Sequence, residues 1–250
     1  MNTSSIKTIR VRCYQITVFC LVLLISGCSK TPEGTEYFPL QKGLSYTYKV
    51  TTEYTDEKYE SHITIDNLGK KSVGDKSYYV RRTSTGLDYY INHNEEGIFR
   101  EALRTKVEHK PRMDNNKRFV IKRPFEVGTE WKIISRPILM MRVYPYRERA
   151  GNSAQVPMIY RIEETNATVT VPAGTFENCI KVYGEGSFSA YMDSVNGQMD
   201  IPMSIEEWYA EGVGLVKQVR YELDGDVINV LNRPIFLGGK TTLVLEEFDD

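Results

Sequence analysis

Residues 44–54 read LSYTYKVTTEY, and the alternation in this stretch decides the fold class. Apolar and aromatic side chains occupy every second position from Leu44 to Val50, and polar side chains fill the positions between them. Successive side chains of a β-strand point to opposite faces of the sheet. The stretch therefore predicts a strand with one buried and one solvated face.

The same period of two continues through the rest of the chain, and no window beyond residue 36 shows a helical stripe. Turn sequences such as Asn196-Gly197 and Asp224-Gly225 separate many of the segments. Short spacings between strands favour antiparallel meanders over parallel units with helical crossovers. The expected strands are 44–54, 59–66, 77–84, 86–92, 97–104, 119–123, 130–143, 157–171, 177–192, 204–211, 214–223, 226–231 and 241–248.

Two polar, turn-rich stretches, 105–118 and 144–157, interrupt this pattern and are predicted to be long loops. Long loops in compact domains are often functional.

The N-terminus has the features of a signal peptide, which we assign to residues 1–27. Basic residues at Lys7, Arg10 and Arg12 precede an apolar run over 16–25. Ten helical residues rise about 15 Å, half of a hydrocarbon core of about 30 Å, so the run is too short for a stable span. The run ends in Ile-Ser-Gly-Cys at 25–28, which resembles the lipobox of bacterial lipoproteins.

This resemblance implies cleavage before Cys28 and lipidation of its thiol. Several acyl chains on one cysteine anchor a protein far more firmly than a single chain does. Ser29 in the next position implies the periplasmic side of the outer membrane if the organism is Gram-negative. Residues 28–36 then form the lipidated cysteine and a polar tether, and residues 37–250 form a single β-rich domain.

Cleavage would leave Cys179 as the one free thiol, since Cys13 and Cys20 lie in the signal peptide. No disulfide could then form within the mature chain. Its apolar neighbours in Asn-Cys-Ile-Lys-Val suggest that Cys179 is a small buried side chain and not a reactive thiol.

Residues 169–176, VTVPAGTF, followed by Cys179, are similar to a pattern in uncharacterised β-rich envelope lipoproteins. The segment WYAEGVGLVK at 208–217 belongs to the same pattern. The resemblance implies a curved antiparallel sheet, either a half-barrel or an open barrel, like that of lipoprotein carriers. It implies no activity.

The glycines and the proline of these segments have structural explanations. Pro172 and Gly174 would make a tight turn between two strands. Gly212 and Gly214 suit a bulge or a positive φ where the sheet bends. A phosphate-binding loop would need a helix after the glycines, whereas the residues after Gly214 read as a strand.

The sequence contains no set of residues that commits it to catalysis. His62, His93 and His109 lie in three unrelated contexts without metal-ligand spacing, so we expect no metal and no cofactor. Adjacent carboxylates at 163–164 and 206–207 would point to opposite faces of a strand and could not act together as acid and base.

Charge is unevenly distributed: residues 100–149 carry 14 Lys and Arg against 6 Asp and Glu, and residues 150–250 carry 6 against 16. The basic segment either faces an anionic partner or is neutralised within the fold. An exported, acidic protein is a poor candidate for nucleic-acid binding. The proposed recognition surface combines side-chain types common at interface hot spots: Arg142, Tyr144, Tyr146, Arg147 and Arg149.

From these features we expect a lipid-anchored envelope protein that acts by binding, either to another envelope protein or to lipid head groups. The alternative is a half-barrel that handles lipids or lipoproteins, which a deep apolar cavity would favour. Catalysis, for example by a hydrolase, has the least support.

Overall fold

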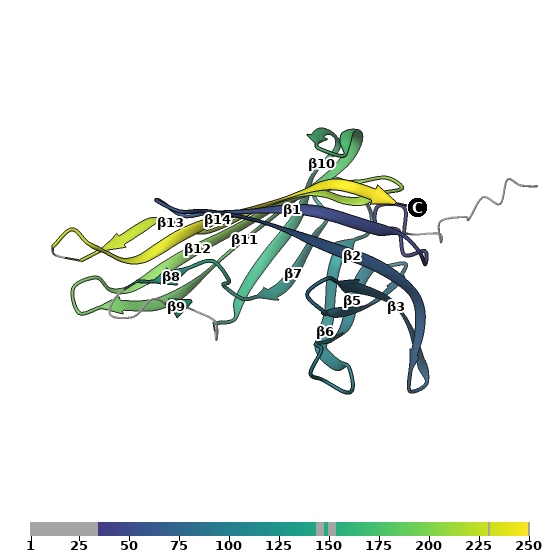
Figure 1. The fold of residues 1–250 in the computed structure, drawn as a ribbon, viewed down its shortest axis with the longest axis horizontal. Coiled ribbons are helices and arrows are strands. Elements are labelled where there is room, and N and C mark those ends of the chain that lie inside the picture. The colour runs from purple at the N-terminus through teal and green to yellow at the C-terminus, as the bar shows by residue number, and fades with distance from the viewer. Residues whose placement is uncertain (1–34, 144–147, 150–153, 230, 250) are drawn as a thin grey trace, which may run out of the picture. The chain divides into compact units, whose positions relative to one another are not determined.

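One continuous antiparallel sheet contains the strands of the computed structural model (Figure 1). The structure describes residues 35–143, 148–149, 154–229 and 231–249, and at 148, 149 and 224 it describes the backbone alone. The strands are β1 (Ser45–Glu53), β2 (Lys58–Val73), β3 (Lys76–Thr83), β4 (Asp88–Asn94), β5 (Gly97–Arg104), β6 (Arg112–Lys122), β7 (Glu130–Ser135), β8 (Met141–Arg142), β9 (Glu148–Arg149), β10 (Val156–Val171), β11 (Gly174–Asp193), β12 (Gly197–Ala210), β13 (Gly214–Ile228) and β14 (Pro234–Asp249).

The sheet consists of two meanders that meet where the first strand pairs with the last. Strands β1 to β6 follow one another in space, as do β10 to β14, and β7 pairs with β10. Figure 1 shows β1 and β14, purple and yellow, side by side, with Val50 of β1 opposite Leu243 of β14. The short strand β8 pairs with both β14 and β9. The predicted all-β antiparallel class is confirmed.

Curvature brings the two ends of the sheet together, so that it forms a nearly closed barrel with one seam. The end strands are β6 and β7. The guanidinium of Arg118, in β6, donates a hydrogen bond to the backbone carbonyl of Ile134, in β7. The curved open-barrel form implied by the sequence resemblance is therefore also confirmed.

The inner face carries the apolar core. Its largest cluster includes Ile98, Ile121, Val156, Ile162 and Ile180, all fully buried. A second cluster forms around Tyr46, Tyr48 and Leu245 where β1 meets β14. Burial of this apolar surface is the main favourable contribution to the stability of such a fold.

Part of the sequence-based assignment of strands and loops was wrong. Residues 112–118, expected to be a loop, belong to β6. Most side chains of this part are exposed, so the alternation that marks a half-buried strand is missing. The strand expected over 130–143 is instead interrupted at 136–140. Pro137 has no N–H, and the N–H groups of Ile138, Leu139 and Met140 donate to the Glu222 carboxylate and not to a neighbouring strand.

Within the described part of the chain, no helix is long and apolar enough to cross a membrane.

Candidate functional site

A cavity of about 380 Å³ lies on the inner face of the sheet. Its size is at the lower end of the range for small-molecule pockets, about 300–1,000 Å³. Both meanders contribute to its wall. The lining residues are Phe38, Tyr48, Ile63, Ile65, Arg81, Thr83, Tyr89, Ile91, Arg100, Arg118, Phe119, Val120, Ile133, Tyr160, Glu207, Tyr209, Leu215, Gln218 and Leu243.

Arg81, in β3, is the most unusual of the lining residues because it is a buried cation that makes no ion pair with any carboxylate of the described residues. Its relative exposure is 6%, and its Nε has no hydrogen-bond partner among the described residues. The guanidinium carbon lies 4.4 Å from the ring centroid of Phe38 and 4.7 Å from that of Tyr46. These cation–π contacts stabilise the buried guanidinium group.

Tyr48 lies beside Arg81 and supplies a hydroxyl to the same region. It donates to the carbonyl oxygen of Leu215 at 2.9 Å. Burial raises the pKa of Tyr48, and the nearby Arg81 charge acts in the opposite direction. The hydroxyl therefore remains a neutral hydrogen-bonding group.

Two further arginines line the cavity, from β5 and β6. Arg100 makes a bidentate pair with Asp114, with Nε–Oδ2 and Nη2–Oδ1 distances of 2.6 and 2.9 Å. Arg118 makes no ion pair among the described residues and bonds to the carbonyl of Ile134 across the seam. Burial lowers the pKa of Arg118, and the charge of Arg100 adds to this effect. An arginine nonetheless keeps its proton at neutral pH.

Glu207, in β12, is the one carboxylate among the lining residues. It accepts hydrogen bonds from the Tyr209 hydroxyl at 2.9 Å and from Gln218 Nε2 at 2.7 Å. Burial raises the pKa of Glu207 despite these bonds and despite the charge of Arg118. Burial also raises the pKa of Tyr209, with a further contribution from Glu207.

The cavity thus combines apolar walls with positively charged groups. Isoleucine, leucine and aromatic side chains make up most of its lining, together with three guanidinium groups. The described lining contains no histidine, cysteine, serine or lysine. The arrangement is suited to holding a ligand by apolar contact and by charge-assisted hydrogen bonds.

A second hollow, of about 560 Å³, crosses strands β11, β12 and β13. Its described lining has a single carboxylate, Glu185, and no cation. It lacks a convergent set of buried polar groups, so we place the candidate site in the smaller cavity.

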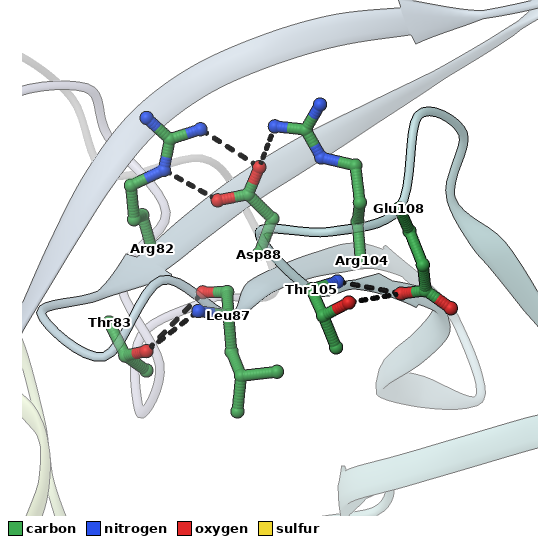
Figure 2. Close-up of polar contacts among 7 residues, drawn as sticks. All are labelled: Arg82, Thr83, Leu87, Asp88, Arg104, Thr105 and Glu108. Carbon is green, nitrogen blue, oxygen red and sulfur yellow. Dashed lines mark hydrogen bonds and ion pairs between the residues drawn. The ribbon is translucent and has the colours of Figure 1, made fainter.

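Four cations of the basic segment, Arg100, Arg104, Lys117 and Arg123, pair with carboxylates of the first half of the chain. Figure 2 shows Arg82 and Arg104 directed at one carboxylate, that of Asp88, which is 2% exposed. Their distances to Asp88 oxygens are 2.6 and 2.5 Å. Burial opposes ionisation of Asp88, but the hydrogen bonds from both arginines outweigh it and lower its pKa.

The other described ion pairs of this segment follow the same rule, since their acidic partners also precede residue 115. Arg100 pairs with Asp114, and Arg123 with Glu36. The ammonium group of Lys117 contacts Glu96. In these pairs, the acidic residues beyond 150 do not supply the neutralising charge.

The sequence-predicted recognition surface lies mostly outside the described residues. This is the case for Tyr144, Tyr146 and Arg147, and for the side chain of Arg149. Arg142 is half-buried, with its guanidinium carbon 5.1 Å from the ring centroid of Phe236. The surface as a whole stays a prediction, and so does lipidation at Cys28, which also lies outside the described residues.

The predicted turn residues all lie at strand ends. Pro172 is in the turn between β10 and β11, and Gly174 begins β11 with φ of 139°. Gly212 and Gly214 connect β12 to β13 with φ of 74° and 100°. The β12–β13 pairing shifts register between Trp208 and Tyr209, close to this turn.

The described residues contain no group of three or more His, Cys, Asp or Glu side chains that could hold a metal ion. His62 contacts Glu246 at 3.0 Å, and His93 packs against Tyr79 with ring centroids 5.7 Å apart. Burial lowers the pKa of His93, helped by the charges of Lys70 and Arg123.

Sequence reasoning missed the cavity residues Arg81, Arg118, Tyr160 and Glu207. One signal was present for Glu207, because it shares a strand face with Ile205 and Tyr209. A carboxylate at a core-facing position is uncommon unless it is paired or functional. Arg81 and Arg82 are adjacent, so one of them had to face inward, but the sequence does not say which.

Comparison with known proteins gives a partial match and two distant structures. A family model described as DUF3108-like matches residues 137–230, which contain β8 to β13. A protein of Bacteroides fragilis, described as exported and as having a YmcC-like fold, shares 15% identity at a TM-score of 0.37. A protein of Parabacteroides distasonis, described as a lipoprotein, shares 17% identity at a TM-score of 0.35. Each alignment covers 85% of this chain and 98% of the other. No curated protein matches.

Proposed function

We propose that this protein is a lipid-anchored protein of the bacterial envelope that binds a small, largely apolar molecule in the cavity of its sheet, without catalysis. Of the two binding hypotheses that the sequence left open, this is the lipid-handling one. The observation that carries it is the cavity of about 380 Å³ with apolar walls and a few convergent polar groups.

The export and anchoring part of the proposal rests on the sequence. The basic start, the apolar run over 16–25 and the cysteine at its end are the elements of a processed lipoprotein precursor. Residues 29–36 span at most about 30 Å when extended, so the binding domain would stay near the bilayer. In a Gram-negative cell, this would be the periplasmic side of the outer membrane.

Anchoring is tested with Cys28→Ala in cells given a radioactive fatty acid. The wild-type protein should be processed, labelled and recovered with membranes. The variant should lose the label and accumulate as precursor or soluble protein. A processed and labelled variant in the membrane fraction would disprove lipidation at Cys28.

Cavity binding is tested with the neutral dye N-phenyl-1-naphthylamine on processed protein reconstituted in phosphatidylcholine nanodiscs. Trp131 stacks on Tyr160, a lining residue, with ring centroids 5.8 Å apart. In a Trp208→Phe background, Trp131 is the single tryptophan and can transfer excitation energy to bound dye. We expect energy transfer from Trp131 to the dye to saturate as dye is added. At the same lipid concentration, this transfer should exceed the transfer measured in a variant whose cavity is filled by a larger side chain.

A filling variant and a matched surface variant provide the comparison. Val120→Phe adds volume at a lining position and should abolish the saturable component. Val107→Phe makes the same change at a side chain that is 87% exposed, and this variant should keep the saturable energy transfer. Equal transfer in all three proteins would mean that the dye lies in the lipid, and the cavity would lose its proposed role.

A further inference from the structure

We propose that the ligand of this cavity has an anionic head, a carboxylate or a phosphate, and that the Arg81 guanidinium binds it while the apolar part lies against the neighbouring wall. This inference rests on the proposed function, because it assigns a chemical class to the ligand of the same cavity.

The first argument is the missing partner of Arg81. Another deeply buried arginine, Arg220, has a fully buried carboxylate, Glu222, at 2.7 Å. Arg81 is at least as buried, makes no ion pair among the described residues, and its Nε has no hydrogen-bond partner there. Buried charges in proteins are generally paired, because desolvation without a partner is costly. An anionic ligand would supply the charged partner that the described residues do not.

The second argument is the way in which Arg81 is held. Its guanidinium carbon lies 4.4 Å from the ring centroid of Phe38 and 4.7 Å from that of Tyr46. The N–H donors of a guanidinium lie at the edge of that plane, in a fork that matches two oxygens of a carboxylate or phosphate. The ring contacts therefore stabilise the position of Arg81, while its Nε–H has no acceptor among the described residues and is available to an anion.

The third argument is the apolar wall beside it. In the register of β2 and β3, Asn67 lies opposite Arg81, and Ile65 lies opposite Thr83. Ile65 and Ile63 both line the cavity, as does Leu243 of β14. A charged donor next to a strip of aliphatic side chains matches an amphiphile, whose head and chain need different surroundings.

The lining contains little that would repel such a head. Glu207 is its one carboxylate, and its two oxygens already accept bonds from Tyr209 and Gln218. Asp114, which does not line the cavity, is paired with the lining residue Arg100. Arg118 adds a second cation that has no ion pair among the described residues.

The test measures displacement of the naphthylamine dye from the nanodisc-bound protein at pH 8. Decanoate and decanol share a ten-carbon chain and differ at the head. We expect decanoate to displace the dye at a concentration roughly tenfold or more below that of decanol, since a hydrogen bond to a charged group has about this effect. Octyl phosphate should behave like decanoate, and inorganic phosphate alone should not displace the dye.

Variants assign the preference to Arg81. Arg81→Met should bring decanoate and decanol to the same concentration, while Arg81→Lys should keep part of the difference. Arg82→Met is the matched control, because it makes the same change at the next residue, whose side chain bonds Asp88 instead. It should leave the preference unchanged. If Arg81→Met does not fold, the inference is tested by the decanoate and decanol concentrations that displace the dye from the wild type and from Arg81→Lys.

The outcomes separate this inference from the proposed function. Saturable dye binding with equal displacement by decanoate and decanol would overturn the anionic head and leave the apolar cavity standing. Displacement by inorganic phosphate would also overturn it, since the site would then take a free anion. Absence of saturable dye binding would overturn the proposed function itself.

Discussion

Nε of Arg220 donates to Oε1 of Glu222 at 2.7 Å, and the Glu222 carboxylate is fully buried. The carboxylate also accepts the backbone N–H groups of Ile138, Leu139 and Met140. Nη2 of Arg220 donates to the carbonyl of Arg136 at 2.6 Å. This pair on β13 therefore holds the segment between β7 and β8, which no ladder of strand hydrogen bonds holds.

Replacing Glu222 by alanine should destabilise the fold strongly. The change leaves the Arg220 charge buried without compensation and three N–H groups without their acceptor, and breaking a buried pair in this way costs about 3–5 kcal/mol. Urea denaturation followed by circular dichroism measures the free energy of unfolding. Arg161→Ala is the control, because its pairs with Glu130 and Glu163 are half-exposed and contribute at most about 1 kcal/mol. Similar losses in both variants would contradict the anchoring role.

Glu207→Gln should change how stability depends on pH. Because burial raises the pKa of Glu207 in the folded protein, the folded chain keeps this proton at pH values above about 4.3, where the unfolded chain releases it. The free energy of unfolding therefore falls as pH rises through this window, up to the folded pKa. Glutamine cannot titrate, so the variant should lack this fall. Urea denaturation from pH 4 to 8 measures it, and identical pH profiles would show that folding does not raise the pKa of Glu207.

Cys179 should not react with thiol reagents in the folded protein. The side chain is fully buried, and burial raises the pKa of its thiol to about 11, so little thiolate exists at pH 8. Iodoacetamide treatment followed by peptide mass spectrometry should find Cys179 unmodified in native protein and fully modified in 8 M urea. Rapid labelling without denaturant would mean that the strand around it opens.

The fold class followed from the sequence because one-sided burial imposes a period of two. The period of two does not identify a strand that lacks one-sided burial. At 112–118, both faces of β6 are largely solvated, so nothing in the pattern distinguishes a strand from a loop. At 136–140, the backbone is held by Glu222, more than 80 residues away. A pattern of neighbouring residues cannot predict such a long-range contact.

The cavity was harder to predict than the fold, because its residues come together through register. Phe38 and Leu243, at the two ends of the domain, belong to one lining. Arg81 faces the cavity and Arg82 faces Asp88, which follows from the pairing of β3 with β2 and β4. The sequence shows two adjacent arginines but not the face of the sheet that each one occupies.

Gly184→Ala should alter the cavity through Tyr160. Gly184 of β11 lies opposite Tyr160 of β10, and a Cβ at 184 would come within 2.9 Å of the Tyr160 ring and 2.8 Å of Ile205. Both distances are too short for a real Cβ, so the aromatic ring must move, and overpacking of this kind costs about 1–3 kcal/mol. Because Tyr160 lines the cavity and stacks on Trp131, the variant should shift Trp131 emission and weaken binding of the naphthylamine dye.

Gly186→Ala separates this effect from overpacking in general. It lies two residues along on the same face of β11, where a Cβ would meet the Pro157 carbonyl at 2.6 Å and Met158 at 3.0 Å, neither of which lines the cavity. Both alanine variants should melt at lower temperature than the wild type. The Gly186 variant should keep wild-type Trp131 emission and dye affinity, because the ring of Tyr160 has no reason to move. If the two variants weaken dye binding equally, then loss of overall stability explains it, and the ring of Tyr160 does not set the shape of the binding cavity.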